Sequence, residues 1–224
     1  MKISVIIPTY NRENDLVETL KCLFNQDFDD YEILVIDQTK KHKEETIKFL
    51  EANKTKFKYI FSDKPSVTRS RNIGIEHAKG EILVFIDDDI LCEPDFLKNH
   101  YRAFLDGYDV VQGKIFEKNS ENAPIWILPW LKYKVLNNKK DQRTPTNSLT
   151  GCNFSVKKAV AEEVGKFDER FYKISVREDS DFGYRCYKAG KKMVFEPTAK
   201  LFHNRQNTGG VDTGIKNHFF DESF

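Results

Sequence analysis

Residues 82–89 carry the sequence ILVFIDDD, in which five apolar residues lead directly into three acids. A short, continuous and β-branched run is typical of a strand that is buried on both faces. The runs Ile3–Ile7 and Ile33–Ile36 have the same character, and apolar residues at helical spacing lie between the three runs, in Leu16–Phe24 and Val67–Ala78. This alternation predicts an α/β fold with a mostly parallel central sheet and right-handed crossovers.

Further elements are predicted from the same periodicities and from capping residues. Asn11 or Asn14 is expected to cap the first helix, and Pro94 is expected to begin a later helix. The other expected elements are a strand at Val110–Ile115, a helix around Val156–Val164, a helix from about Glu178 to Ala189 and a strand at Met193–Glu196.

Length and composition limit the classes of protein to which the chain can belong. Its 224 residues, of which 39% are hydrophobic and 32% charged, can bury a substantial core and are too apolar for disorder. We expect one domain over residues 1–204, with halves at 1–115 and 116–204, and a flexible tail over 205–224. The net charge of +1 gives no reason to expect a nucleic-acid partner.

Cysteine usage and hydropathy favour a cytoplasmic location. The four cysteines are scattered and form no CxxC pair, which indicates reduced thiols rather than a zinc cage or a disulfide framework. The apolar run that begins at Ile3 is too short for a signal peptide or a membrane span, and Pro8 ends it.

Polar residues follow each of the three predicted parallel strands. The segments are PTYNR at 8–12, DQT at 37–39 and DDD at 87–89. Because ligands bind beyond the carboxyl ends of parallel strands, we expect the three segments to meet at one rim. A divalent cation such as Mg²⁺ or Mn²⁺ would relieve the repulsion among the three acids, although a solvated acidic turn is the simpler alternative. Alternation along the chain should place Asp87 and Asp89 on one side and Asp88 on the other.

Two common nucleotide-binding motifs and the nucleophile turn of hydrolases are missing from the sequence. It contains no GxGxxG, no GxxxxGK[ST] and no GxSxG segment. Arg69 and Arg71 lie on the helix before the acidic strand, where they could pair with a diphosphate or hold the acids in place. An ordinary solvated helix face is the alternative for both arginines.

Six short motifs occur in a recognisable order. They are PTYNR at 8–12, VID at 35–37, RNIG with AKG at 71–80, FIDDD at 85–89, GCN at 151–153 and ED at 178–179. Together they resemble the GT-A-fold glycosyltransferases of family 2, which are inverting enzymes that use nucleotide sugars. The resemblance runs from Met1 to about His203 and implies a Rossmann-like sheet flanked by helices, with a smaller acceptor-side region.

The resemblance also implies roles for the residues that would bind the nucleotide. A UDP-sugar is the expected donor, and a dTDP-sugar is the nearest variant. Asp37 would contact the base, and Arg71 would support the base or the phosphates. The rest of the nucleotide pocket would be formed by Pro8, Tyr10 and Arg12.

A metal site and a catalytic pair are implied in the same way. Asp87 would lie near the ribose, and Asp89 would bind Mn²⁺ or Mg²⁺, although Asp88 could be the ligand instead. His203 would complete the metal shell. The resemblance assigns Asp179 as the general base, Glu178 to the sugar or acceptor pocket, and Gly151 and Asn153 to the lining of the sugar site.

Simpler explanations exist for the catalytic residues, and other functions remain open. Carboxylates such as Glu178 and Asp179 are favourable in the first turn of any helix. The residues Gly151 and Asn153 could form an ordinary turn. A catalytically silent nucleotide-sugar-binding or partner-docking module could use the same fold. A nucleotidyltransferase would need a Gly-rich basic segment after the first strand, and this chain has TYNR there.

Both tryptophans lie in the segment PIWILPWLKYK at residues 124–134, near Lys139, Lys140 and Arg143. Aromatic residues beside basic residues suit a peripheral contact with the anionic inner membrane leaflet, where a lipid-linked acceptor would be presented. A wall that stacks a saccharide acceptor and a hydrophobic flap packed on the sheet are the alternatives.

Overall fold

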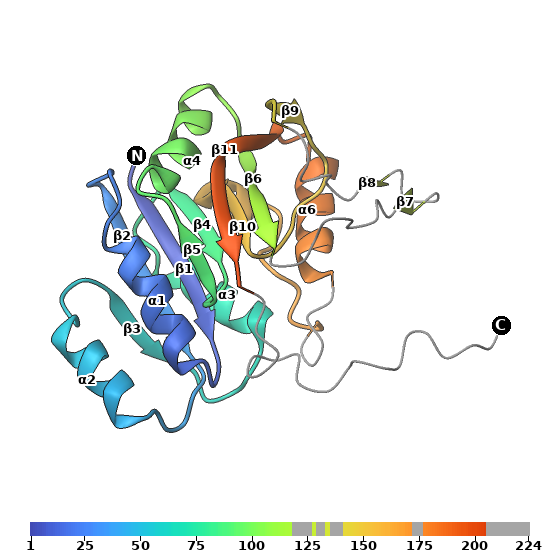
Figure 1. Ribbon diagram of the computed structural model, residues 1–224. Coiled ribbons are helices and arrows are strands. Elements are labelled where there is room, and N and C mark those ends of the chain that lie inside the picture. Colours follow the sequence, from blue (N-terminus) through green and yellow to red (C-terminus); the bar gives the residue numbers. More distant parts are fainter. Residues whose placement is uncertain (118–126, 129–132, 135–140, 172–176, 205–224) are drawn as a thin grey trace.

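The computed structural model describes residues 1–117, 127–128, 133–134, 141–171 and 177–204. Its first part alternates strands and helices: β1 (Ile3–Thr9), α1 (Glu13–Leu23), β2 (Tyr31–Asp37), α2 (Glu44–Ala52), β3 (Lys58–Phe61), α3 (Val67–His77) and β4 (Ile82–Ile86). These four strands are parallel and lie in the order β3-β2-β1-β4 (Figure 1). The predicted parallel sheet is therefore confirmed for this part of the chain.

The second part adds antiparallel strands to the same sheet. Its elements are β5 (Ile90–Cys92), α4 (Phe96–Leu105), β6 (Val110–Glu117), β7 (Ile127–Leu128), β8 (Tyr133–Lys134), β9 (Thr144–Pro145), β10 (Asn153–Lys157), α5 (Lys158–Glu163), α6 (Glu178–Lys188) and β11 (Met193–His203). Strand β10 is antiparallel to both β4 and β6, and β11 is parallel to β6. The order of the main sheet is β3-β2-β1-β4-β10-β6-β11-β5, while β7 and β8 pair with each other.

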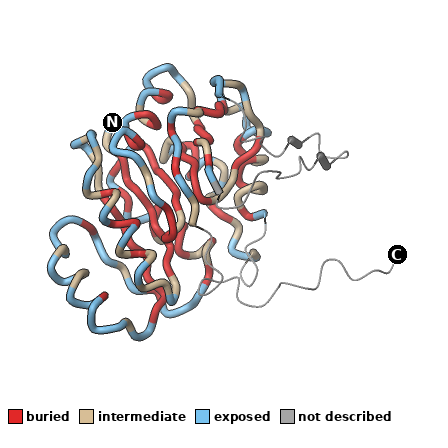
Figure 2. The backbone as a smooth tube through the Cα atoms, in the orientation of Figure 1, coloured by how far each residue is buried: buried red, intermediate tan, exposed pale blue. Residues whose placement is uncertain are grey.

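Helices cover both faces of the sheet, because alternate residues of each central strand point to opposite faces. Val5 and Val84 pack with α1 and α4 on one face, while Ile6 and Phe85 pack with α3, α5 and α6 on the other. Figure 2 shows the result as buried strands between helices with exposed outer surfaces. No helix in the described part of the chain is long and apolar enough to cross a bilayer.

The strand directions bring several chain segments to one rim. Because β1, β2 and β4 are parallel, Thr9, Asp37 and Ile86 all end strands at the same edge of the sheet. Antiparallel β10 begins at that edge, with Asn153 paired to Ile86. Strand β11 ends there too, with His203 paired to Ile90. The rim therefore joins segments from both parts of the chain, and the predicted meeting of the three polar segments is confirmed.

Two predicted elements differ from the structure in their bounds. The helix predicted around Val156–Val164 begins only at Lys158, because Val156 pairs with both β4 and β6 within β10. The last predicted strand continues to His203 after a register shift between Glu196 and Lys200, so His203 ends the strand rather than following it.

The helix starts and the segment after β2 also differ from the prediction. The N-cap of α1 is Arg12, without a side-chain capping hydrogen bond, and Asn11 has a positive φ of 55°. Pro94 lies two residues before α4. Helix α2 and strand β3 were not predicted, since the short β3 lies at the sheet edge with Tyr59 and Phe61 exposed and so lacks a continuous buried pattern.

Candidate active site

Of the three acids that follow β4, two face His203 and one faces β1. Asp88 is buried and accepts a hydrogen bond at 2.6 Å from Thr9 Oγ1 of β1. Asp89 Oδ2 accepts from Arg12 Nη1 at 2.7 Å, and Asp89 Oδ1 lies 3.1 Å from His203 Nε2. Asp87 faces the same imidazole, with its Oδ2 at 3.7 Å from Nε2. Asp87 and Asp89 therefore share His203, while Asp88 turns toward β1, which is the separation that alternation predicts.

Electrostatics separate Asp88 from Asp89 further. Burial raises the pKa of Asp88 to about 8, despite the hydrogen bond from Thr9 and the charge of Arg12. Burial would also raise the pKa of Asp89, but the hydrogen bonds and charges of His203 and Arg12 outweigh it, and the pKa falls to about 2. At neutral pH Asp89 carries a negative charge and Asp88 is mostly protonated. Of the two, Asp89 is the better cation ligand.

The residues around His203 fit the divalent cation that the sequence implies. Carboxylate oxygens of Asp87 and Asp89 and the imidazole nitrogen of His203 are ligand types that Mn²⁺ accepts, and Mg²⁺ takes the carboxylates. One further donor lies here: single ligand atoms of Asp87, Cys152 and His203 all lie within 4.8 Å of one another. Sequence reasoning missed Cys152 as a donor, since it treated this residue only as the middle of the GCN motif.

Arg71 of α3 connects this acidic turn to the start of α6. Its side chain is 2% exposed, and its Nη1 donates to Glu178 Oε1 at 2.9 Å. Its Nη2 donates to the carbonyl oxygen of Gly151 at 3.0 Å and lies 3.7 Å from Asp87 Oδ1. The guanidinium also stacks over the ring of Phe167, 5.2 Å from its centroid. Arg71 thus holds three chain segments in one arrangement.

Two buried polar atoms at this junction make no hydrogen bond with the described residues. They are Nε of Arg71 and Oε2 of Glu178. Buried polar groups without a partner are uncommon in folded proteins and need an explanation. A sugar hydroxyl could donate to Glu178 Oε2, and an oxygen of a sugar or a diphosphate could accept from Arg71 Nε.

Asp179 lies beside Glu178 in the first turn of α6. Its Oδ2 accepts from the backbone N–H of Gly151 at 2.7 Å, and its Oδ1 accepts from that of Ser180 at 2.6 Å. Burial raises the pKa of Asp179 to about 6, and the charge of Glu178 acts in the same direction, against Arg71 and the two backbone donors. The carboxylate is therefore mostly ionised at neutral pH. Its pKa is also close enough to neutral pH for it to accept a proton during the reaction.

There is no room for a side chain at Gly151. A Cβ at this position would lie 2.8 Å from Arg71 Nη2. The peptide backbone of Gly151 accepts from Arg71 and donates to Asp179, so it bridges these two side chains. The structure places Gly151 at the candidate site, as a backbone contact.

Asn153 begins β10 at the rim, but its side chain points into the core. It is 0% exposed, and its Oδ1 lies 3.0 Å from His100 Nε2. Its Nδ2 donates to the backbone carbonyls of Lys114 and Ala199, at 2.9 and 3.0 Å. Since these contacts already occupy the side chain, we do not include Asn153 in the proposed sugar site.

Asp37 is also fully buried, with both carboxylate oxygens engaged. Its Oδ1 accepts from the backbone N–H of Thr39 at 2.7 Å, and its Oδ2 lies 2.7 Å from His42 Nε2. The other ring nitrogen of His42 lies 3.1 Å from Glu13 Oε2. A nucleobase that bonds directly to Asp37 would have to displace one of these partners. Sequence reasoning gave His42 no role.

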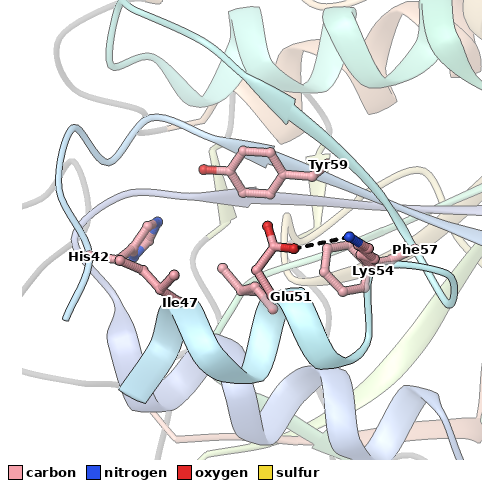
Figure 3. A pocket seen from close by; sticks show the side chains of 7 residues that line it. His42, Ile47, Glu51, Lys54, Phe57 and Tyr59 are labelled. Carbon is pink, nitrogen blue, oxygen red and sulfur yellow. Dashed lines mark hydrogen bonds and ion pairs between the residues drawn. The ribbon is translucent and has the colours of Figure 1, made fainter. Parts of the chain in front are cut away.

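His42 also borders a pocket of about 260 Å³ between α2 and β3 (Figure 3). Besides His42 the pocket is lined by Ile47, Leu50, Glu51, Lys54, Phe57 and Tyr59. Burial and the nearby charge of Asp37 raise the pKa of Tyr59. The pocket is thus linked to the rim through Asp37.

The remaining residues predicted for the nucleotide pocket lie along the end of β1. Pro8 is buried within that strand, and Tyr10 is half-buried immediately after it. Arg12 is half-buried and paired with Asp89. The structure therefore brings Tyr10, Arg12 and the acidic turn to the same end of the sheet.

Comparison with known proteins defines the class to which this fold and site belong. Residues 4–165 match the family described as Glycosyl transferase family 2. The chain belongs to this family, as its six motifs predict. A relative in Campylobacter jejuni, GalNAc(5)-diNAcBac-PP-undecaprenol beta-1,3-glucosyltransferase, is 30% identical over 76% of this chain and 56% of its own length. The poly(ribitol-phosphate) beta-N-acetylglucosaminyltransferase TarS of Staphylococcus aureus is 31% identical over 55% of this chain and 22% of its own length. The chain thus spans about half or less of these relatives.

Solved structures show the same fold. S. aureus TarS 1–349 in complex with UDP-GlcNAc has a TM-score of 0.70 and 21% identity, covering 95% of this chain and 61% of that chain. GalNAc-T7 with UDP, GalNAc and Mn²⁺ has a TM-score of 0.77 and 16% identity, covering 92% of this chain and 44% of that chain. The predicted GT-A fold is confirmed.

Proposed function

We propose that this chain transfers one sugar, with inversion, from a UDP-sugar to an acceptor hydroxyl, and that a dTDP-sugar is the nearest alternative donor. The observation that carries the proposal is the junction at which Arg71 and the backbone of Gly151 join the acidic turn to Asp179. A donor-side acidic turn and an acceptor-side carboxylate are thereby held at one rim. Membership of glycosyl transferase family 2 supports this assignment.

The site residues have three roles in the proposed reaction. Asp179 takes the proton of the acceptor hydroxyl while the hydroxyl oxygen forms a bond to the anomeric carbon, and the bond from that carbon to the diphosphate breaks. Glu178 shapes the sugar pocket and is held by Arg71. Asp87, Asp89 and His203 would hold Mn²⁺ or Mg²⁺, which supplies charge neutralisation for the departing diphosphate when bound.

The donor class is supported by the neighbours and by the rim itself. TarS and GalNAc-T7 were solved with UDP-GlcNAc and with UDP, GalNAc and Mn²⁺, respectively. Tyr10 and Arg12 are partly accessible beside the acidic turn, where they could meet a nucleoside diphosphate. We place Asp37 behind them, as a buried group that orients the pocket wall through His42.

The acceptor is proposed to be a saccharide or a lipid-linked saccharide in the synthesis of a polysaccharide or glycoconjugate. The names of the relatives support this, since one refers to an undecaprenol-linked substrate and another to poly(ribitol-phosphate). A lipid-linked acceptor would favour a peripheral membrane contact. The tryptophans of segment 124–134 proposed for that contact lie outside the described residues. Co-sedimentation with anionic vesicles at low and high salt tests it.

Isosteric substitution of the base tests the proposed function. Asp179→Asn should keep donor binding nearly intact and reduce sugar transfer by roughly 10²- to 10⁴-fold, the usual contribution of a positioned general base. Asp181→Asn is the matched control, because Asp181 lies in the same first turn but pairs with Arg185. Donor binding without any transfer by the wild-type chain would instead favour the catalytically silent module.

A further inference from the structure

Three different ligand types meet at the rim because of how the sheet is threaded. Asp87 follows β4, and Cys152 directly precedes β10, which is antiparallel to β4. His203 ends β11 beside them. One carboxylate oxygen, one sulfur and one imidazole nitrogen therefore lie within 4.8 Å of one another, although the three residues are far apart in the sequence.

The sulfur changes the chemistry of this site. Oxygen and imidazole ligands suit Mn²⁺, whereas a thiolate selects softer ions such as Zn²⁺ and Cd²⁺. Zn²⁺ commonly takes four ligands drawn from sulfur, nitrogen and oxygen, including sites with three protein ligands. The 3.7 Å between Asp87 Oδ2 and His203 Nε2 is of the size found between ligands of one ion, and a ligand atom of Cys152 lies within 4.8 Å of one of each.

We propose that Cys152 joins Asp87 and His203 in binding a thiophilic divalent cation of the Zn²⁺ and Cd²⁺ class. This proposal rests on the proposed function in one respect: the same rim is proposed to bind the diphosphate of the donor. Because Asp87 and His203 belong to both sets, a thiophilic cation would displace Mn²⁺ or Mg²⁺. The thiol of Cys152 would thereby favour Zn²⁺ and Cd²⁺ over Mn²⁺ and Mg²⁺ at this site.

Any test must distinguish metal binding by Cys152 from metal binding by the other cysteines. Cys22 and Cys92 lie 3.2 Å apart, sulfur to sulfur, between α1 and β5, and could bind a soft ion as a pair. Cys186 is buried in α6. A Cys22→Ser, Cys92→Ser double variant removes the competing pair and leaves the rim unchanged. Cys186→Ser is a control for the loss of a buried thiol.

The experiment is a titration of the metal-free double variant with Cd²⁺, followed by the ultraviolet charge-transfer absorption of cadmium thiolate. We expect one equivalent of Cd²⁺ to give this band, and adding Cys152→Ser to abolish it, while adding Cys186→Ser leaves it unchanged. In a competition with a chromophoric chelator, Cys152→Ser should weaken Zn²⁺ binding at least about 10-fold, because even the loss of a residue that only hydrogen-bonds to a metal ligand lowers metal affinity by that factor.

A measurement without substitution at Cys152 guards against misfolding of that variant. X-ray absorption of the Zn²⁺-loaded double variant should show one sulfur at about 2.3 Å. A shell of oxygen and nitrogen only, or a charge-transfer band that survives Cys152→Ser, would overturn the proposal. Calorimetry with UDP and Mn²⁺ is run in parallel. If UDP binds in an Mn²⁺-dependent way but the metal has no sulfur ligand, only the proposed role of Cys152 is wrong. If the metal has its sulfur ligand but UDP does not bind, the proposed donor is wrong.

Discussion

At the scale of single residues, the acidic turn shows how two adjacent carboxylates acquire different chemistry. Asp88 accepts a hydrogen bond from Thr9, and its burial raises its pKa to about 8. Asp89 is paired with Arg12 and His203, and its pKa falls to about 2. Sequence alone left open which of the two binds the cation, because both are acids next to the same strand.

The matched pair Asp88→Asn and Asp89→Asn tests this difference. We expect Asp89→Asn to abolish the Mn²⁺-dependent part of UDP binding, because it removes a charged ligand beside His203. Asp88→Asn should keep that part, since the amide oxygen can still accept from Thr9. Calorimetry with UDP in Mn²⁺ and in EDTA measures both. If only Asp88→Asn loses the metal-dependent binding, the cation ligand is Asp88.

The raised pKa of Asp179 predicts the pH dependence of transfer. A base must be ionised, and a carboxyl with a pKa of about 6 is protonated below that pH. We therefore expect kcat/KM to rise with increasing pH up to about 6 and then to level off. The Asp181→Asn control should keep the same profile. A profile that stays flat through this pH would exclude Asp179 as the titrating base.

At the scale of secondary-structure elements, the antiparallel strand β10 organises the site from its N-terminal end. Its N-terminal end carries Gly151 and Cys152 to the rim, and the side chain of Asn153 binds α4 through His100. The same side chain donates to carbonyls of β6 and β11. Asn153 therefore fixes the position of the turn that contacts Arg71 and Asp179.

Asn153→Ala tests this structural role against a role in sugar binding. The substitution removes the hydrogen bond at His100 Nε2 and two hydrogen bonds to strand carbonyls, and each buried loss costs about 1–3 kcal/mol, so the free energy of unfolding should fall by at least about 3 kcal/mol. Chemical denaturation measures this change. Asn25→Ala is the control, because Asn25 is exposed at the end of α1. Unchanged stability with weaker donor binding would return Asn153 to the sugar site.

At the scale of the whole molecule, the candidate site is assembled from both parts of the chain. The acidic turn and Arg71 come from the parallel part, while Asp179 and His203 come from the part that contains the antiparallel strands. A ligand that bridges the rim therefore stabilises the packing of both parts together. Such a ligand raises the stability of the entire native state.

We accordingly expect UDP and Mn²⁺ together to raise the unfolding temperature more than either one alone. At a ligand concentration of 100 times Kd, the stabilisation is about 2.7 kcal/mol. Thermal unfolding with UDP, dTDP and GDP, each with Mn²⁺ or EDTA, measures the effect. UDP should give the largest shift. A clear preference for GDP or dTDP would contradict the assignment of the base pocket.

The sequence by itself determined three of the four parallel strands (β1, β2 and β4), the meeting of three polar segments at one rim and the family. These features depend on local periodicity and on short motifs, which each segment carries independently of its neighbours. Only the tertiary structure decided that Asp89 rather than Asp88 faces His203, that His42 covers Asp37, and that Cys152 lies beside Asp87. The contacts of His203 and Cys152 depend on the antiparallel insertion of β10 and on the register shift in β11, which set distances between segments that no local pattern encodes. The contact of His42 with Asp37 depends on the path of the loop after β2, which also brings His42 to Glu13 of α1.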